Sequence, residues 1–336
     1  MINKLIESRY FEKNCFSLRK YSPYLNMAYE SHYGINIENN SNITNDDRKK
    51  CLKASKSSLN SLRRALDIES TNSNVPKSLW LYWNSDIDKA PEVVRVSIES
   101  WKKLNPDYTV TIINDNNIKD VLGFDFNAVF QLATVNLGLA MKADILRLYL
   151  LSMYGGVWAD TTTFCLKSLD TWLPEQVKDT KLFFFRHESN KTRPIEAWFI
   201  AANQGNSVIK NTLKLFLEHL FKPRTHSLFI SNRIKSIGKR DSEQERFFKE
   251  VVFEAEEKGF MPYFSVGYFF NDSLRKDSEL SIWEDIKNST NNCVVNHSPF
   301  DKFTQSYVSK QTYKKDYQDS SLFKERIEYM KGTVLK

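Results

Sequence analysis

Residues 143–160 read ADILRLYLLSMYGGVWAD, and this stretch decides the fold. Its first part is apolar on nearly every side, which predicts a buried helix over residues 137–154. The double glycine then ends that helix, because glycine readily adopts the left-handed conformation that follows helix C-termini. A very short strand over residues 157–159 delivers Asp160 at its carboxyl end. The unit therefore holds a carboxylate at the edge of a sheet, where open α/β sheets bind ligands.

The segments around this unit alternate between strand and helix patterns. Residues 78–83 predict a short aromatic strand, residues 91–104 a helix, and residues 108–113 a second strand. Further along the chain we expect strands over 182–185 and 197–201 and helices over 207–221 and 244–257. This order predicts an α/β fold with a mixed, mainly parallel sheet flanked by helices.

Composition narrows the function classes. The net charge of +7 arises from 48 basic and 41 acidic residues spread along the chain, whereas nucleic-acid binders usually carry a dense basic stripe. We therefore expect no nucleic-acid partner. The four cysteines form no C-x-x-C pair and are expected to be reduced thiols. The first residues lack the apolar region of a signal peptide, and no stretch approaches a membrane span. These features predict a cytoplasmic protein.

Three regions are expected along the chain. Residues 1–74 predict a polar helical extension with a loop over 38–46, residues 75–300 the main domain, and residues 301–336 a basic, aromatic tail. The leucines expected on one helical face of the extension are Leu52, Leu59, Leu62 and Leu66. A helical tail could rest on an anionic membrane surface. Packing of the tail back on the domain is the alternative.

Asp144 and Arg147 lie three residues apart, on one face of the predicted helix. An ion pair on a solvated face is one interpretation, and such pairs contribute little. The flanking residues are apolar nearly all round, so the pair must instead point into a cleft or be satisfied internally.

Asp160 is followed by three threonines, so that carboxylate and hydroxyl oxygens lie together. Such oxygens suit a hard divalent cation, although a turn or a helix cap would use the same residues. Near the other end of the chain, His297 stands between Asn296 and Ser298 after an apolar pair and is a second candidate for a metal or phosphate contact.

The strand over 78–83 carries Trp80, Tyr82 and Trp83. Strand alternation puts Trp80 and Tyr82 on one face and Trp83 on the other. These rings could stack on a nucleobase, and core packing is the alternative.

Taken together, these motifs resemble a known family, the bacterial capsular polysaccharide synthesis glycosyltransferases, which are related to glycosyltransferase family 32. The residues that carry the resemblance are Val75–Trp80 with Trp83 for "I-P-K-x-I-W", Ser97–Tyr108 for a helix followed by "N-P-x-[YW]", Ala143–Arg147 for "[SA]-D-x-x-R" and Tyr154–Asp160 for "Y-G-G-[VI]-[YW]-x-D".

The resemblance implies a GT-A fold and a nucleotide-sugar donor, UDP- more than GDP-sugar, with Mn²⁺ or Mg²⁺ and retention at the anomeric carbon. It puts Asp144 and Arg147 in the donor pocket and Asp160 in the D-x-D metal motif. Thr162 stands where that motif has its second Asp. His297 would be the remaining metal ligand. Because Thr162 replaces a carboxylate, we expect weaker metal binding and a less strict requirement for the metal.

The other contacts implied by the resemblance concern the donor and the acceptor. The further donor-binding residues would be Trp80, Tyr82, Trp83, Gly155, Gly156 and Trp158. Glu196 and Trp198, on the segment after Arg193-Pro194, are candidate contacts to the sugar or the acceptor, although Glu196 could equally be a surface residue. The resemblance implies that the acceptor is a glycan or a lipid-linked sugar of surface polysaccharide synthesis. A tail that rests on a membrane would place the protein at the inner face of the plasma membrane.

Three other functions stay open from the sequence. A relative without catalysis would bind sugar nucleotides only, and a further transferase would act on a protein acceptor. A glycoside hydrolase would need two carboxylates flanking the bond, for which Asp144 and Asp160 could serve.

Overall fold

The structure is a computed structural model of the 336-residue chain. It describes residues 2–6, 8, 10, 11, 15, 18, 21–32, 45–71, 73–135, 137–186, 195–222, 224, 228–231, 248–288 and 292–336. Within these residues, no helix is both long and apolar enough to cross a membrane.

The strands and helices follow the α/β order expected from the sequence. The strands are β1 (Ser78–Tyr82), β2 (Thr109–Ile113), β3 (Gly156–Ala159), β4 (Thr163–Cys165), β5 (Leu182–Phe185), β6 (Glu196–Ala202), β7 (Phe229–Ser231), β8 (Phe260–Pro262), β9 (Cys293–Val294) and β10 (Val308–Lys310). The helices are α1 (Ile2–Ile6), α2 (Pro23–His32), α3 (Asn45–Arg63), α4 (Glu92–Leu104), α5 (Ile118–Leu122), α6 (Leu139–Tyr154), α7 (Leu173–Gln176), α8 (Ser207–Leu220), α9 (Lys249–Glu257), α10 (Ser265–Leu274), α11 (Leu280–Asn288), α12 (Phe300–Gln305), α13 (Lys315–Gln318) and α14 (Ser321–Tyr329).

The central sheet has the strand order β2-β1-β3-β6-β5. β1 pairs in parallel with both β2 and β3, whereas β6 is antiparallel to its neighbours β3 and β5. Four of the five strands therefore point the same way, with β6 reversed between them. This arrangement confirms the predicted mixed, mainly parallel sheet.

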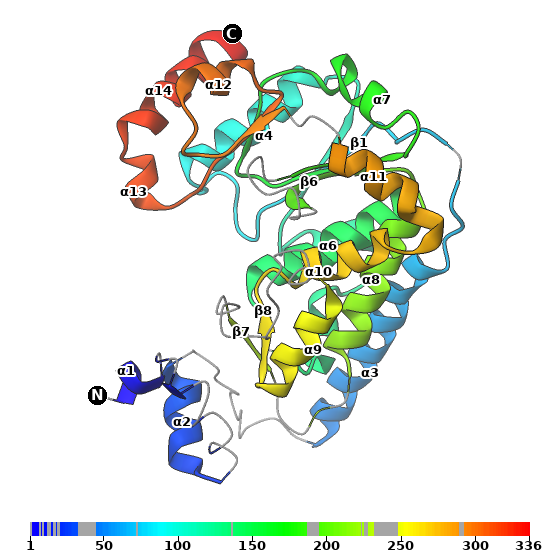
Figure 1. Cartoon of the computed structure of the whole chain (residues 1–336), viewed down its shortest axis with the longest axis vertical. Helices are drawn as coiled ribbons and strands as arrows, with labels where there is room; N and C mark the ends of the chain where they lie inside the picture. Colours follow the sequence, from blue (N-terminus) through cyan, green and yellow to red (C-terminus); the bar gives the residue numbers. More distant parts are fainter. Residues whose placement is uncertain are drawn as a thin grey trace.

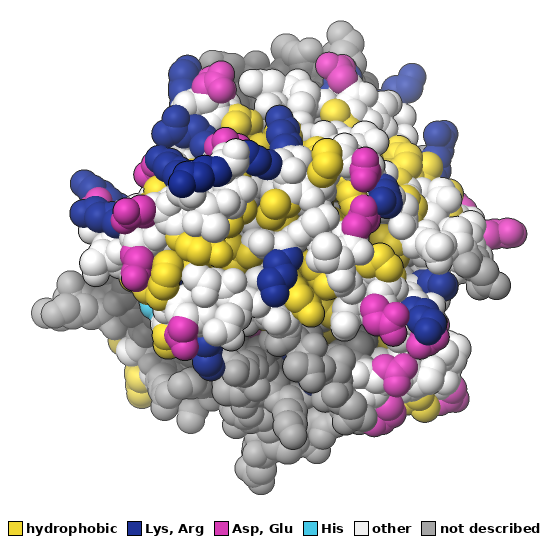
Figure 2. Space-filling model, turned by 90° about the horizontal axis from the view of Figure 1, so that it is seen from above, with side chains coloured by type: hydrophobic (Ala, Val, Ile, Leu, Met, Phe, Trp, Pro, Cys, Tyr) yellow, Lys and Arg dark blue, Asp and Glu magenta, His cyan; other side chains and the backbone are white. Residues whose placement is uncertain are grey.

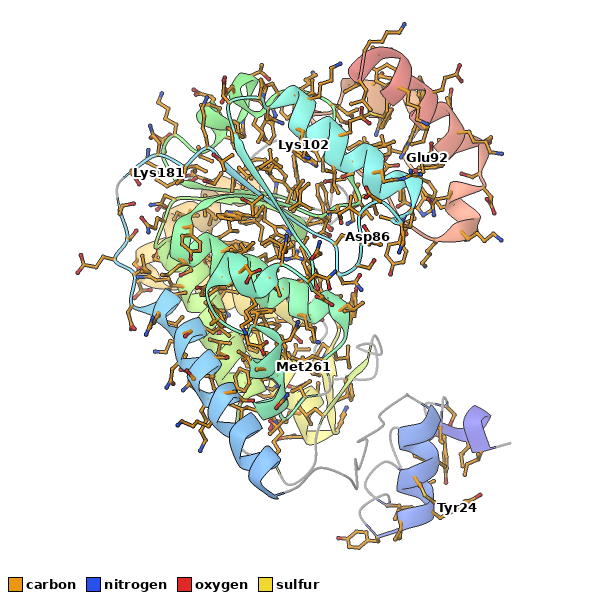
Figure 3. All side chains as sticks on the ribbon, turned by 180° about the vertical axis from the view of Figure 1, so that it is seen from behind. Tyr24, Asp86, Glu92, Lys102, Lys181 and Met261 are labelled. Carbon is orange, nitrogen blue, oxygen red and sulfur yellow. The ribbon has the colours of Figure 1, made fainter. Side chains whose placement is uncertain are left out.

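Helices cover both faces of this sheet. In Figure 1, α4 and α7 lie above it and α6, α8 and α10 below it. From behind, Lys102 of α4 and Met261 of β8 lie on opposite sides of the sheet (Figure 3). The sheet is thus the middle layer of three, with β3 and β5 buried on both faces and the edge strand β2 partly exposed.

Strand alternation assigns the β1 side chains to the two faces. Leu79 and Leu81 enter the hydrophobic cluster on the α4 side, and Trp83 packs against the same cluster. Trp80 and Tyr82 pack against the cluster that contains the α6 residues. The predicted split of the three aromatic residues between the faces is confirmed.

The tail beyond residue 300 is not wholly helical. β10 pairs with β4 in antiparallel fashion and with β9 in parallel fashion, forming a second sheet of three strands. Phe323, Ile327 and Met330 of the following segment are buried in the hydrophobic cluster on the α4 side. Backbone pairing with β4 outweighs helix propensity at β10, because those hydrogen bonds tie the segment to the domain.

The N-terminal region contributes to the same core. Leu59 and Leu62 of α3 are buried in the cluster below the sheet, with Leu66 packed against it, while the side chain of Leu52 lies outside the described residues. The predicted loop over 38–46 also lies outside them, except for its last two residues, which belong to α3. Residues 244–247, the start of another predicted helix, are likewise outside, and α9 is described from Lys249.

Candidate active site

The carboxyl end of the central sheet gathers the polar side chains. Asp160 directly follows β3, and its backbone N–H donates to the carbonyl of Trp198 on β6, 2.8 Å away. The hydroxyl of Thr161 donates to the carbonyl of Tyr82 at the end of β1, 2.9 Å away. These bonds hold the turn after β3 against its neighbouring strands, so the position of Asp160 is set by the sheet.

Arg147 connects the two carboxylates predicted from the sequence. Its Nη2 lies 3.2 Å from Oδ1 of Asp144 and 3.3 Å from Oδ1 of Asp160. The side chains of Arg147 and Asp144 are 6% and 10% exposed, whereas that of Asp160 is 27% exposed. The helix pair thus points inward to the strand end and not onto a solvated face. Asp160 is the carboxylate that a ligand can reach.

The guanidinium of Arg147 is held on several sides. Its Nη1 donates to the backbone carbonyl of Ala197, its Nε donates to the carbonyl of Ala143 at 3.3 Å, and its Cζ lies 5.1 Å from the ring centroid of Trp158. The indole N–H of buried Trp158 donates to Oδ1 of Asp160 at 3.0 Å. Arg147 and Trp158 therefore orient Asp160 from beneath.

Lys310 completes the charged cluster, and the sequence analysis missed it. Its Nζ lies 2.8 Å from Oδ2 of Asp160 and 2.8 Å from the hydroxyl oxygen of Thr162. The side chain extends from β10, whose partner strand β4 directly follows the Asp160 turn. In the sequence, Lys310 is one of many basic residues in the tail. It reaches Asp160 only because β10 pairs with β4, and these two strands lie far apart along the chain.

The two carboxyl groups have pKa values shifted in opposite directions. Burial raises the pKa of Asp144 to about 7, against the opposing charge of Arg147 and with a further rise from Asp160. Burial also acts to raise the pKa of Asp160, but the charges of Lys310 and Arg147, with hydrogen bonds from Lys310 and Trp158, outweigh it and lower that pKa. Asp160 is therefore ionised at neutral pH, while Asp144 titrates near it.

Two tyrosines next to the cluster were also missed. Tyr263, between β8 and α10, has its pKa raised by burial and then by the negative charges of Asp144 and Asp160, which puts its phenol within their electrostatic reach. Tyr313 interacts electrostatically with Tyr263 and meets Trp83 edge to face, with ring centroids 5.7 Å apart. Both tyrosines are exposed. Aromatic surfaces thus border the charged cluster, where a sugar or a base could pack against them.

The aromatic residues of β1 and the two glycines, which the sequence offered as donor contacts, make their polar and close contacts within the protein. The indole N–H of Trp80 donates to the carbonyl of Gly155 at 2.9 Å, and the hydroxyl of Tyr82 donates to Asp115 at 2.8 Å. Gly156 has a φ of +100°, and a Cβ there would lie 2.4 Å from the carbonyl oxygen of Ser78. These glycines let α6 and β3 approach neighbouring backbone.

The remaining predicted residues lie in two places. The indole N–H of Trp198 donates to the carboxylate of Glu196 at 3.1 Å, and the Trp198 ring stacks on Phe185 with centroids 5.1 Å apart. His297 is exposed in the turn after β9, and its ring nitrogen lies 3.3 Å from the amide of Asn296.

The oxygens expected to hold a divalent cation are already engaged. Lys310 contacts both Asp160 and Thr162, and the other carboxylate oxygen of Asp160 accepts from Trp158. In the part of the chain that the structure describes, no three His, Cys, Asp or Glu side chains form a group that could hold a metal ion. Hard divalent cations prefer several oxygen ligands. The described residues therefore do not fit a protein-held metal unless Lys310 moves away.

Two proteins that are similar to this chain are named as a glycosyltransferase and a mannosyltransferase. The chain is 27% identical over 154 residues to the O-glycosyltransferase braB of Annulohypoxylon truncatum, a match that covers 42% of this chain and 37% of that protein. It is 32% identical over 110 residues to an initiation-specific alpha-1,6-mannosyltransferase of Saccharomyces cerevisiae, covering 31% of this chain and 23% of that protein. The chain thus spans less than two fifths of the length of these relatives.

A solved structure and a family model also match. The structure named PaToxG Glycosyltransferase aligns with 85% of this chain and 97% of its own, at 18% identity and a TM-score of 0.33, a likeness too distant to carry weight. The family model described as "Capsular polysaccharide synthesis protein" matches residues 31–261. Because this match covers well over half of the 336 residues, the chain belongs to the capsular polysaccharide synthesis protein family.

Proposed function

We propose that this protein is a glycosyltransferase that moves a sugar from a nucleotide-sugar donor, a UDP-sugar more than a GDP-sugar, to a glycan or lipid-linked acceptor of surface polysaccharide synthesis. The observation that carries the proposal is the cluster of Asp160, Arg147 and Lys310 at the carboxyl end of the sheet. Membership of the capsular polysaccharide synthesis family and similarity to named glycosyltransferases support it.

The charge balance of the cluster suits an anionic leaving group. Arg147 and Lys310 bring two positive charges, Asp160 brings one negative charge, and Asp144 titrates near neutral pH. With Asp144 protonated, the four groups carry a net charge of about +1 by simple summation of full charges. A donor diphosphate that approaches the exposed side of Asp160 therefore meets a positive site that is already ordered.

The transfer step needs little covalent chemistry from the protein. The bond between the anomeric carbon and the diphosphate oxygen breaks, and its electron pair goes to that oxygen. The acceptor hydroxyl oxygen forms the new bond to the anomeric carbon, and its proton passes to the departing diphosphate. Attack from the face that the leaving group vacates gives retention and requires no protein nucleophile. Positive charge fixed beside the departing oxygen stabilises the transition state.

Nothing tests the Mn²⁺ or Mg²⁺ expected from the resemblance, and Lys310 competes with such an ion for Asp160 and Thr162. When bound, such an ion would supply Lewis-acid neutralisation of the diphosphate, and the protein ligands expected from the sequence are Asp160, Thr162 and His297. Lys310 would then have to leave both oxygens. The expected cytoplasmic location and the contact of the tail with a membrane surface also stay predictions.

The geometry argues against the glycoside hydrolase alternative. That reaction needs space between two carboxylates for the scissile bond. Here a single guanidinium nitrogen lies between Asp144 and Asp160, at 3.2 and 3.3 Å from their oxygens. The site of bond cleavage would therefore be filled by Arg147.

A donor panel tests the proposed function. We expect the purified protein to hydrolyse or transfer from one UDP- or GDP-sugar, and Asp160→Asn to lower that turnover by about 10²-fold or more, since the neutral side chain no longer orients Lys310 and Arg147. Nucleotide release measures the rate, and calorimetry measures donor binding. Asp120→Asn, on an exposed position of α5, is the control for the loss of one carboxylate.

The outcomes separate the alternatives. Donor binding without turnover by any acceptor would favour the sugar-nucleotide-binding alternative. Turnover of Asp160→Asn at the wild-type rate would contradict the role of Asp160. Transfer of the sugar to an added protein, and not to a glycan or a lipid-linked sugar, would show that the acceptor is a protein.

A further inference from the structure

We propose that Lys310 is the built-in cation of this site and takes the place of a divalent metal ion on Asp160. The inference rests on the proposed transferase function. Its basis is the position of the ammonium group, which lies 2.8 Å from Oδ2 of Asp160 and 2.8 Å from the hydroxyl oxygen of Thr162. These two side chains are the ones that the sequence offered as metal ligands on the strand end.

The contacts around Asp160 leave little room for a metal beside Lys310. One carboxylate oxygen accepts from Lys310, and the other accepts from Trp158 and lies 3.3 Å from Arg147. A divalent ion at hydrogen-bond distance from the ammonium would meet strong repulsion between like charges. Metal and ammonium therefore exclude each other on this carboxylate, and the described structure places the ammonium there.

Lys310 is also accessible to a ligand. Its side chain is 23% exposed, beside Asp160 at 27%. An ammonium group has three N–H donors. Among the described residues it donates to Asp160 and Thr162, so one donor remains for a phosphate oxygen. Lysine binds phosphate as a compact point charge, which suits a diphosphate that gains negative charge as it leaves.

The backbone holds Lys310 in place before any ligand binds. Lys310 lies opposite Thr163 in the antiparallel pair of β10 and β4, and the backbone N–H of Gln311 donates to the carbonyl of Thr162 at 2.7 Å. The strand is thereby tied to the same turn that presents Asp160. A charge positioned in this way needs no reorganisation during the reaction.

A buried polar network fixes the residue next to Lys310. The side-chain oxygen of Gln311 accepts from the hydroxyl of Tyr317 and from Arg326, which is 3.3 Å away. Arg326, fully buried, also donates to the carbonyl of Ser298 at 2.6 Å. This network anchors β10 at the residue next to Lys310, and the loss of one partner would leave the other buried polar groups unsatisfied.

In the transfer step Lys310 donates a hydrogen bond and keeps its proton. As the bond between the anomeric carbon and the diphosphate oxygen breaks, the electron pair moves to that oxygen, and the ammonium neutralises the growing charge. The acceptor proton still passes to the departing diphosphate. No additional reactant is required.

The experiment compares Lys310→Met with the wild-type protein and with Lys324→Met, which removes an exposed lysine of α14. Turnover of the donor found in the panel is measured in EDTA and in Mn²⁺. Binding of Mn²⁺ is measured separately by electron paramagnetic resonance, in the presence of UDP as the diphosphate probe. Circular dichroism reports whether each variant is folded, and Lys310→Arg keeps the charge should Lys310→Met fold poorly.

We expect the wild-type protein and Lys324→Met to keep their rate in EDTA. Lys310→Met should lose about 10²-fold, regain part of this with Mn²⁺, and bind Mn²⁺ with UDP at least about 10-fold more tightly than wild type, while Lys310→Arg keeps most of the rate. A wild-type rate that disappears in EDTA and returns with Mn²⁺, together with Mn²⁺ binding unchanged by Lys310→Met, would overturn the proposal.

Failure of the proposed function gives a different result. A wild-type protein that turns over no donor would contradict the transferase proposal. The Mn²⁺ titration would still decide the competition between Lys310 and a metal, because it requires no catalysis.

Discussion

Asp144 and Asp160 share one guanidinium group, yet their pKa values move in opposite directions. Asp160 lies between Lys310 and Arg147, and these charges outweigh its burial. Asp144 has Arg147 alone against its burial, and its pKa rises to about 7. Lys310, together with the hydrogen bond from Trp158, thus separates a carboxylate that is ionised at neutral pH from one that titrates near neutral pH.

The raised pKa of Asp144 predicts a loss of stability with rising pH. Between its unfolded value of 3.8 and about 7, the folded state holds a proton that the unfolded state has released, so the free energy of unfolding falls as the pH rises through this window. Asp144→Asn cannot titrate. Its free energy of unfolding relative to wild type should rise by about 1–2 kcal/mol between about pH 5.5 and about pH 7.5.

Urea unfolding at the two pH values measures this difference. Asp120→Asn is again the control for removing one carboxylate. Equal differences between Asp144→Asn and wild type at both pH values would show that Asp144 does not titrate in this window.

At the scale of elements, the site depends on how closely β3 approaches β1. Gly156 opens β3 with a φ of +100°, and a side chain there would meet the backbone carbonyl of Ser78. The same approach brings the end of β3 beside the end of β1, where Thr161 bonds the carbonyl of Tyr82. The glycine of the Tyr-Gly-Gly motif therefore serves sheet packing, and Asp160 gains its position from it.

Gly156→Ala should lower the free energy of unfolding by about 2–4 kcal/mol, because it combines a strained backbone conformation with a contact of 2.4 Å to the carbonyl oxygen of Ser78. Urea unfolding measures the change. Gly332→Ala, where an added Cβ meets no atom within 4 Å, is the matched control. If the two variants are equally stable, β3 does not need this close approach.

At the scale of the whole molecule, the tail is part of the domain and of the site. Figure 2, seen from above, shows basic side chains gathered on one side of this face with acidic ones among them and hydrophobic ones exposed between them. Phe323 and Met330 of the tail are buried in the same cluster as residues of α4. Some of the apolar side chains that would have to contact a membrane are thus buried in the core of the domain.

Phe323→Ala should therefore lower the free energy of unfolding by about 3–5 kcal/mol, since it empties a buried position. Lys324→Ala, at the neighbouring exposed position, should change it by less than about 0.5 kcal/mol. Denaturant unfolding of both proteins gives the comparison. A tail that acts only as a membrane anchor would tolerate both changes equally.

Most of what could be predicted from the sequence came from short-range patterns. The apolar helix, the double glycine and the strand that ends at Asp160 are all short-range features, and the structure has them within a few residues of the expected bounds. The face that Asp144 and Arg147 share follows from helix geometry alone. The sequence by itself also indicated the α/β order and the family, because the motifs stand in a fixed order along the chain.

Only the tertiary structure decided what surrounds Asp160. Lys310 is 150 residues away in sequence, and a strand of three residues has no periodicity that would identify its partner. Tyr263 and Tyr313 reach the same place from other segments. Strand pairing is set by long-range hydrogen bonds and burial, which a local pattern does not encode. The carboxylate was thus determined by the sequence, and the cation that neutralises it by the fold.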